Sequence, residues 1–371
     1  NMLPLAKLSQ TLPINSLTLH GATTVSFTGT TLDTLTLASG GLLAGSDAQN
    51  RVIGATTNAN TRGRITSSAS EFFIHNGANT LTIHSAITGT TNPVFTSAGT
   101  AGGATIRLTN ANTYVGSTFS NGVILLLDNQ TGGGAAITGD LTLTGGNISG
   151  TETGSVANST VRNLGAHQIA DAAAVTVRGG AAWDLNGFNE TIARVAFNSQ
   201  GGITGGSTIT TFSGALTLTN SANTISASNL DDVRVISHLA GRLSLPSVAT
   251  VTVAQVAGGL TAVQGTAGQS NEQIGLAINA SILAGGTINK EGLGVLQLGG
   301  FSSQSLTVNV NAGQLVIGPN TNGSASNYAD TAVNLAASGV ILDMRGNSNV
   351  ALGTISGVAG TFIKNFHPTS G

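Results

Sequence analysis

Two neighbouring carboxylates, Asp231 and Asp232, have the spacing in this chain that comes closest to acid–base chemistry. A pair of carboxylates supplies the acid and the base, or the nucleophile, in glycoside hydrolysis. Polysaccharide hydrolases built on β-helices also carry Asn-Thr-Asp, Gly-His-Gly and Arg-x-Lys triplets, and this chain contains none of them. We therefore expect the pair to lie in a solvated loop or at a helix start, and we predict no catalytic residues.

Metal and cofactor sites are disfavoured by residue type and spacing. The chain has no Cys, which excludes thiolate ligands, cysteine nucleophiles and disulfides. It also lacks a His-Glu-x-x-His motif, calcium-binding nonapeptides, a phosphate-binding glycine loop and a Gly-x-Ser-x-Gly elbow. We predict no metal and no cofactor. The histidines form no pair with ligand spacing; they are His20, His75, His84, His167, His238 and His367.

Three further side-chain groups have both a chemical and a structural interpretation. Trp183 and Phe188 would stack on sugar rings if exposed, but we expect them to cover an apolar edge. Arg62 and Arg64 form a small basic spot, which we interpret as a solvated loop. Lys7, Lys290 and Lys364 are the three lysines of the chain.

Composition excludes several classes of protein. Charged residues make up 8% of 371, against about a quarter in ordinary globular proteins, which rules out a typical enzyme surface and a charged helical bundle. A net charge of -2 provides no basic footprint for nucleic acid. The 40% of hydrophobic residues argue against disorder. No apolar stretch reaches the roughly 18 residues of a membrane-spanning helix.

Short runs alternate apolar and polar residues, the period of half-buried β-strands. Clusters of Gly, Asn and Ser such as Gly132-Gly133-Gly134 separate the runs and indicate tight turns. Helical signals are weak, the best being residues 229–238. The clearest strand predictions are Leu17–Leu19, Leu141–Leu143, Val175–Val177, Leu216–Leu218 and Leu306–Val308.

Internal repetition favours a β-solenoid over a sandwich or barrel. Residues 174–187 recur as 332–346, with an apolar-Asp-apolar-x-Gly ending in both copies, and residues 81–89 resemble 276–285. Both segments of the second matching pair precede a further predicted strand: Ile106–Leu108 follows residues 81–89, and Val295–Leu298 follows residues 276–285. Repeats too small to bury their own apolar face are typical of stacked, one-dimensional architectures.

Three segments resemble the autotransporter-associated β-strand repeat of bacterial surface proteins. They are residues 286–318, the turn Asn112-Thr113-Tyr114-Val115-Gly116, and residues 185–192. The resemblance implies a right-handed parallel β-solenoid in an exported, surface-displayed passenger that serves adhesion, autoaggregation or scaffolding. It implies no catalytic residues.

We expect an all-β, right-handed parallel solenoid over residues 1–371, with a small insert near 229–246, and a chain that continues beyond either end. Coils of about 20 residues would place equivalent side chains directly above one another. A column of like charges would repel, so uncharged residues are favoured at these positions. Open ends would either stack head to tail with another copy or be capped outside this sequence.

The function expected from these features is non-enzymatic and extracellular, at a bacterial surface: a rigid spacer, an adhesin or a filament subunit. Its expected partners are copies of itself or a neighbouring cell surface, with glycans as a further option, and neither nucleic acid nor a membrane span. The alternative is a carbohydrate-active enzyme or a glycan-binding β-helix.

Overall fold

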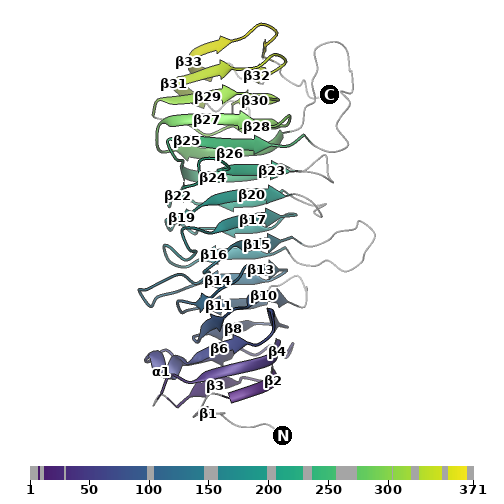
Figure 1. Ribbon diagram of the computed structural model, residues 1–371, viewed down its shortest axis with the longest axis vertical. Helices are drawn as coiled ribbons and strands as arrows, with labels where there is room; N and C mark the ends of the chain where they lie inside the picture. Colours follow the sequence, from purple (N-terminus) through teal and green to yellow (C-terminus); the bar gives the residue numbers. More distant parts are fainter. Residues whose placement is uncertain are drawn as a thin grey trace, which may run out of the picture. The chain divides into compact units, whose positions relative to one another are not determined.

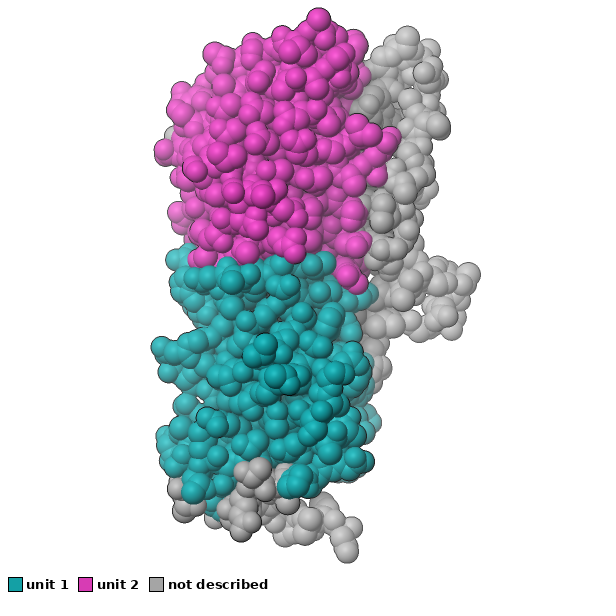
Figure 2. All heavy atoms as spheres, in the orientation of Figure 1, with its two compact units in different colours: residues 1–176, 181–190 teal, residues 177–180, 191–371 magenta. Residues whose placement is uncertain are grey.

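The computed structural model describes most of the chain, in two compact units. Unit 1 comprises residues 1–176 and 181–190, and unit 2 comprises residues 177–180 and 191–371 (Figure 2). The described residues are 7–8, 12–28, 31–97, 104–145, 158–198, 206–228, 236–255, 274–302, 304–318, 326–344 and 350–365.

Strands form where the sequence alternates apolar and polar residues. In β8 (Thr80–Ile83), Leu81 and Ile83 are buried while the two threonines are half-buried. β-Branched and leucine side chains pack well on the buried face of a pleated strand, and threonine suits the face that is partly exposed to solvent. All five runs selected from the sequence lie within strands: β2 (Leu12–Leu19), β15 (Leu141–Thr144), β17 (Ala174–Arg178), β22 (Leu216–Leu218) and β29 (Leu306–Val310).

Within each unit the strands pair in parallel, each with a strand of the next coil (Figure 1). In unit 1, β11 (Thr105–Leu108) lies between β8 and β14 (Ile124–Leu127). Buried side chains therefore stack in register through successive coils, as in the column Leu81, Ile106, Leu125, Val161 and Trp183. The predicted parallel β-solenoid is confirmed.

The coil of residues 71–89 in unit 1 contains three strands. The chain passes through β7 (Glu71–Asn76), β8 and β9 (Ala86–Gly89), and then repeats the path one level further on. In that next coil β10 (Asn92–Ser97) pairs with β7, β11 with β8, and β12 (Thr113–Tyr114) with β9. Each coil thus closes around an apolar interior and presents its outward side chains on flat faces.

Coil length is not uniform and departs in places from the expected length of about 20 residues. Val295 lies beside Gln314, 19 residues further along, whereas His238 lies beside Ala277, 39 residues further along. Strand register is kept in both places, so the additional residues fall in the connections between strands.

The region expected as an insert, residues 229–246, is a strand over most of its described part. Residues 229–235 lie outside the described residues, while Ser237–Ser244 form β24, which pairs with β21 (Thr208–Thr210), β22 and β26 (Ile274–Ile282). The expected helix near His238 is therefore wrong at that residue. Leu239 and Leu243 are buried in the core, and this burial decides the structure despite the charged neighbours.

Helix is confined to one short turn in the described part of the chain. α1 (Ala59–Arg62) has four residues and is capped by Asn58. No helix in that part is long and apolar enough to cross a membrane.

The remaining strands have the following bounds. Those of unit 1 are β1 (Lys7–Leu8), β3 (Thr24–Phe27), β4 (Thr34–Ala44), β5 (Arg51–Ile53), β6 (Arg64–Ser67), β13 (Thr118–Asn121), β16 (Thr160–Asn163) and β18 (Ala182–Asp184). β17 and β19 (Glu190–Ile192) contain residues of both units, and unit 2 also holds β20 (Arg194–Asn198), β23 (Ile225–Ser228), β25 (Val248–Val253), β27 (Gly286–Glu291), β28 (Val295–Leu298), β30 (Gln314–Ile317), β31 (Ser326–Leu335), β32 (Ile341–Asp343), β33 (Val350–Gly357) and β34 (Phe362–Lys364).

The Asn-x-Tyr-x-Gly turn in unit 1 joins three successive coils. Asn112 accepts a hydrogen bond from the Ile87 backbone NH at 2.8 Å and donates to the Ala136 carbonyl at 2.6 Å. The buried Tyr114 hydroxyl lies 2.5 Å from the Thr118 hydroxyl and accepts from the Thr138 NH at 3.4 Å. Buried polar groups of this turn are thus satisfied by the coils before and after it.

An asparagine ladder runs along the outer face of unit 2. Asn289, Asn309 and Asn334 occupy in-register positions of β27, β29 and β31. Asn309 donates to the Asn289 Oδ1 at 2.9 Å and Asn334 donates to the Asn309 Oδ1 at 3.4 Å, and Ser356 of β33 donates to the Asn334 Oδ1 at 3.3 Å. Asn309 and Asn334 each donate to one neighbour and accept from the next, which requires that the coils keep their register.

We predict that Asn309→Asp lowers the free energy of unfolding by about 1–2 kcal/mol at pH 7. The carboxylate cannot donate to Asn289 and places negative charge beside its amide oxygen. Urea denaturation measures the change, with Thr307→Ser on the same strand as the control. Equal stability of Asn309→Asp and the parent at pH 7 would show that the ladder contributes nothing.

Candidate functional site

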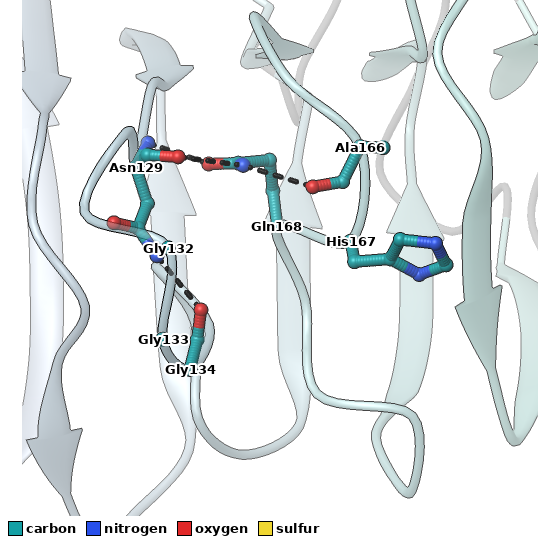
Figure 3. Close-up of a pocket in the computed structure, with 7 residues that line it drawn as sticks. All are labelled: Asn129, Gly132, Gly133, Gly134, Ala166, His167 and Gln168. Carbon is teal, nitrogen blue, oxygen red and sulfur yellow. Dashed lines mark hydrogen bonds between the residues drawn. The ribbon is translucent and has the colours of Figure 1, made fainter.

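A cavity of about 260 Å³ opens on the surface of unit 1, between two connections of the solenoid (Figure 3). One wall is the glycine turn predicted from the sequence, Gly132–Gly134, and the opposite wall is the segment Ala166–Gln168. Its lining residues are Asn129, Gly132, Gly133, Gly134, Ala166, His167 and Gln168.

The amide groups at this cavity form hydrogen bonds within its two walls and between them. The Asn129 NH donates to the Gln168 Oε1 at 2.7 Å, and the Gln168 amide donates to the Ala166 carbonyl at 3.1 Å and to the Asn129 carbonyl at 3.3 Å. The Asn129 side chain donates to the Gly134 carbonyl at 2.7 Å. These bonds tie the two connections together (Figure 3).

A buried carboxylate, Glu190, lies behind this cavity wall. Its Oε2 accepts from the Asn163 amide at 2.7 Å and from the backbone NH groups of Gln168 at 2.8 Å and Ile169 at 3.3 Å. Asn163 in turn accepts from the Trp183 indole NH at 3.1 Å. The carboxylate is compensated by several donors, as a buried charge requires.

This arrangement holds loops and contains no acid–base pair that faces the cavity. His167 is the one titratable residue among the seven lining residues, and its exposed ring points away from the glycine turn (Figure 3). Glu190 is fully buried. A general acid or base needs access to substrate, so these groups are placed for structure.

The other histidines are dispersed over the solenoid. His75 Nδ1 lies 2.9 Å from the Thr96 hydroxyl, and His84 Nδ1 lies 2.6 Å from that of Thr109. Burial lowers the pKa of His75, His84 and His238. In the described ranges no three His, Asp or Glu side chains gather closely enough to hold a metal ion. His20 is exposed, and His367 lies outside the described residues.

The remaining residues selected from the sequence have structural positions. Asp231 and Asp232 lie outside the described residues. Trp183 is 1% exposed, as expected for a residue that covers the apolar interior, and Phe188 is half-buried. Arg62 ends α1 and Arg64 begins β6, so the basic spot lies where a helical turn meets a strand.

A buried lysine, Lys290, is a feature that the sequence reasoning missed. It is 0% exposed, and its Nζ donates to the carbonyls of Glu291 at 3.0 Å, Gly292 at 2.5 Å and Ala312 at 2.9 Å. The ammonium group therefore joins the turn after β27 to the turn of the next coil. The period of two from Ile288 placed Lys290 on the inner face, and that was the available signal.

Burial lowers the pKa of Lys290 from 10.5 to about 8, with a smaller opposing effect from Glu291. The neutral amine is thus favoured more in the folded chain than in the unfolded one.

We predict that Glu190→Ala lowers the free energy of unfolding by about 3 kcal/mol, because it leaves buried NH groups without an acceptor. Glu71→Ala, at an exposed glutamate of β7, is the matched control and should change stability by less than about 0.5 kcal/mol. Denaturant titration of both variants decides. A loss for Glu190→Ala no larger than that of the control would refute the structural role.

We predict that Lys290 makes stability rise with pH between about 8 and 10.5. In this window the unfolded chain retains a proton that the folded chain has released, so the free energy of unfolding increases with pH. Urea denaturation at pH 7.5 and 9.5 should show a larger gain for the parent than for Lys290→Met. An equal gain for both would mean that the Lys290 pKa is not lowered by folding.

Comparison with known proteins gives no relative: no family model, curated protein or solved structure matches this chain. The resemblance to the autotransporter-associated repeat therefore stays a prediction.

Proposed function

We propose that this chain is a non-enzymatic structural protein at a bacterial surface, whose β-solenoid acts as a stiff spacer. One observation carries the proposal: successive coils are joined in register by backbone pairing, by a continuous interior column and by side-chain ladders. The column from Leu81 to Trp183 and the ladder from Asn289 to Ser356 are the clearest cases.

Such bonding supports a mechanical role. Each coil covers its apolar side chains with its neighbours, so bending or extending the stack separates many contacts together. The bridges made by Asn112 and Lys290 hold turns of different coils as well as strands. A spacer needs this coil-to-coil resistance and no reactive group.

We also propose that copies of this chain assemble end to end, which would extend the spacer. In the described residues, β33 pairs with β31 and β34 with β32. Four apolar side chains on or beside these strands are 41–55% exposed: Ile355, Val358, Phe362 and Ile363. In the proposed assembly a second copy pairs in parallel with this coil, in the heterologous manner that builds filaments.

Stretching single molecules tests the spacer role. Release of single coils of 19–39 residues should lengthen the chain in steps of about 7–14 nm, each opposed by a distinct force peak. Smooth extension without peaks would contradict the proposal. Antibody labelling of intact source cells tests the location, and absence of surface label would contradict it.

Sedimentation at increasing concentration tests end-to-end assembly. The parent should form larger species, and Phe362→Asp should remain a monomer because it places a charge in the apolar contact. Leu293→Asp, at a 67% exposed leucine of another turn, is the control and should assemble like the parent. A monomeric parent at all concentrations would refute assembly while leaving the spacer role to the stretching experiment.

A further inference from the structure

One outer face of unit 1 carries two parallel columns of side chains with different chemistry. The aromatic column contains Gly41, Phe73, Val94, Phe119 and Thr142, which are in-register positions of β4, β7, β10, β13 and β15. The polar column contains His75, Thr96, Asn121 and Thr144, two residues further along the last four strands.

The Phe73 ring is accessible because of its neighbour. Phe73 is 46% exposed, and the adjacent position on β4 is Gly41, which has no side chain to cover it. On the other side, Val94 is buried beside Phe73 and Phe119, although it points outward. Phe73 and the half-buried Phe119 thus occupy strand positions two strand spacings apart, about 9.6 Å, along the direction in which coils stack.

The polar column borders the rings with hydrogen-bonding groups. His75 Nδ1 lies 2.9 Å from the Thr96 hydroxyl, and burial lowers the pKa of His75, which favours its neutral ring. Asn121 and Thr144 continue the column and are half-buried. Neither column carries a formal charge at neutral pH; the exposed Glu71 at the start of β7 lies two residues before Phe73.

We propose that this face binds a neutral, β-linked polysaccharide, with the chain laid along the aromatic column. Sugar rings present apolar C–H faces that stack on aromatic rings, and hydroxyl edges that hydrogen-bond to polar side chains. The two-strand spacing of Phe73 and Phe119 is comparable to the repeat of two sugars in an extended β-linked chain. Two columns without charge match a neutral polymer, whereas an acidic polysaccharide would need basic residues that these columns lack and would be repelled by the neighbouring Glu71. This binding goes beyond the spacer role and is independent of it.

Two substitutions probe this face in complementary ways. Phe73→Ala removes the exposed ring. Gly41→Val keeps the ring but covers it, and the backbone tolerates the change because a Cβ at Gly41 would lie 3.6 Å from its nearest neighbour, Ser16, at ordinary contact distance. Phe301→Ala, at a 50% exposed phenylalanine of unit 2, is the matched control.

Binding of cellohexaose and chitohexaose, measured by titration calorimetry on the full chain, tests the proposal. The parent should bind at least one of them, and both Phe73→Ala and Gly41→Val should weaken that binding at least tenfold at unchanged melting temperature. Phe301→Ala should bind like the parent.

Three outcomes would overturn the proposal. The first is no binding of either oligosaccharide or of insoluble β-glucan by the parent. The second is binding that both Phe73→Ala and Gly41→Val leave intact. The third is a preference for an acidic polysaccharide that disappears at high salt, which would indicate a charged site elsewhere. If Phe73→Ala melts at a lower temperature, Gly41→Val alone decides.

Discussion

In-register parallel stacking is the constraint on which the rest of this structure depends. Each residue lies about 4.8 Å from its counterpart in the next coil, so a side chain must be compatible with a neighbour at the same position. Inside, this condition favours columns of Leu, Ile and Val. Outside, it favours residues such as Asn and Thr that donate to one neighbour and accept from the next, as in the ladder of Asn289, Asn309 and Asn334. The scarcity of charge in the sequence follows from the same condition, since like charges in one column would repel.

The buried charges show how strict this condition is. Glu190 is held by amide and backbone donors, Lys290 by three carbonyls, and Arg51 by Asp47 and the Gln49 carbonyl. Glu190 and Lys290 join segments more than 20 residues apart in the sequence, whereas Arg51 is held by residues two and four positions before it. The interior side chains hold the coils together, so the outward side chains are the ones that a partner can contact. The flat face that carries Phe73 and Phe119 combines this cohesion with two phenylalanines at positions two strands apart.

Sequence periodicity predicted the strands and the solenoid, because burial on one face leaves a period of two in runs such as Leu141–Leu143. It failed at residues 237–244, where charged and polar residues hid the buried leucines, and it did not anticipate β30, whose residues are all buried. Internal repetition, by contrast, predicted Val295–Leu298, which is β28. Trp183 was placed correctly at an apolar position. The period of two from Ile288 indicates the inward position of Lys290, but the pairing of Phe73 with Gly41 depends on which coil follows which. That register is set by connections of variable length, so composition and spacing could not predict it.

Distances between spin labels along one column test the stacking most directly, and the absence of Cys in the chain makes paired labelling simple. Leu43 and Thr144 are four coil steps apart in one register column, and Thr18 is one step beyond Leu43. Pulsed electron paramagnetic resonance should give about 19 Å for labels at Leu43 and Thr144 and about 24 Å for labels at Thr18 and Thr144. Distances that do not increase by about one strand spacing per coil would contradict the parallel solenoid.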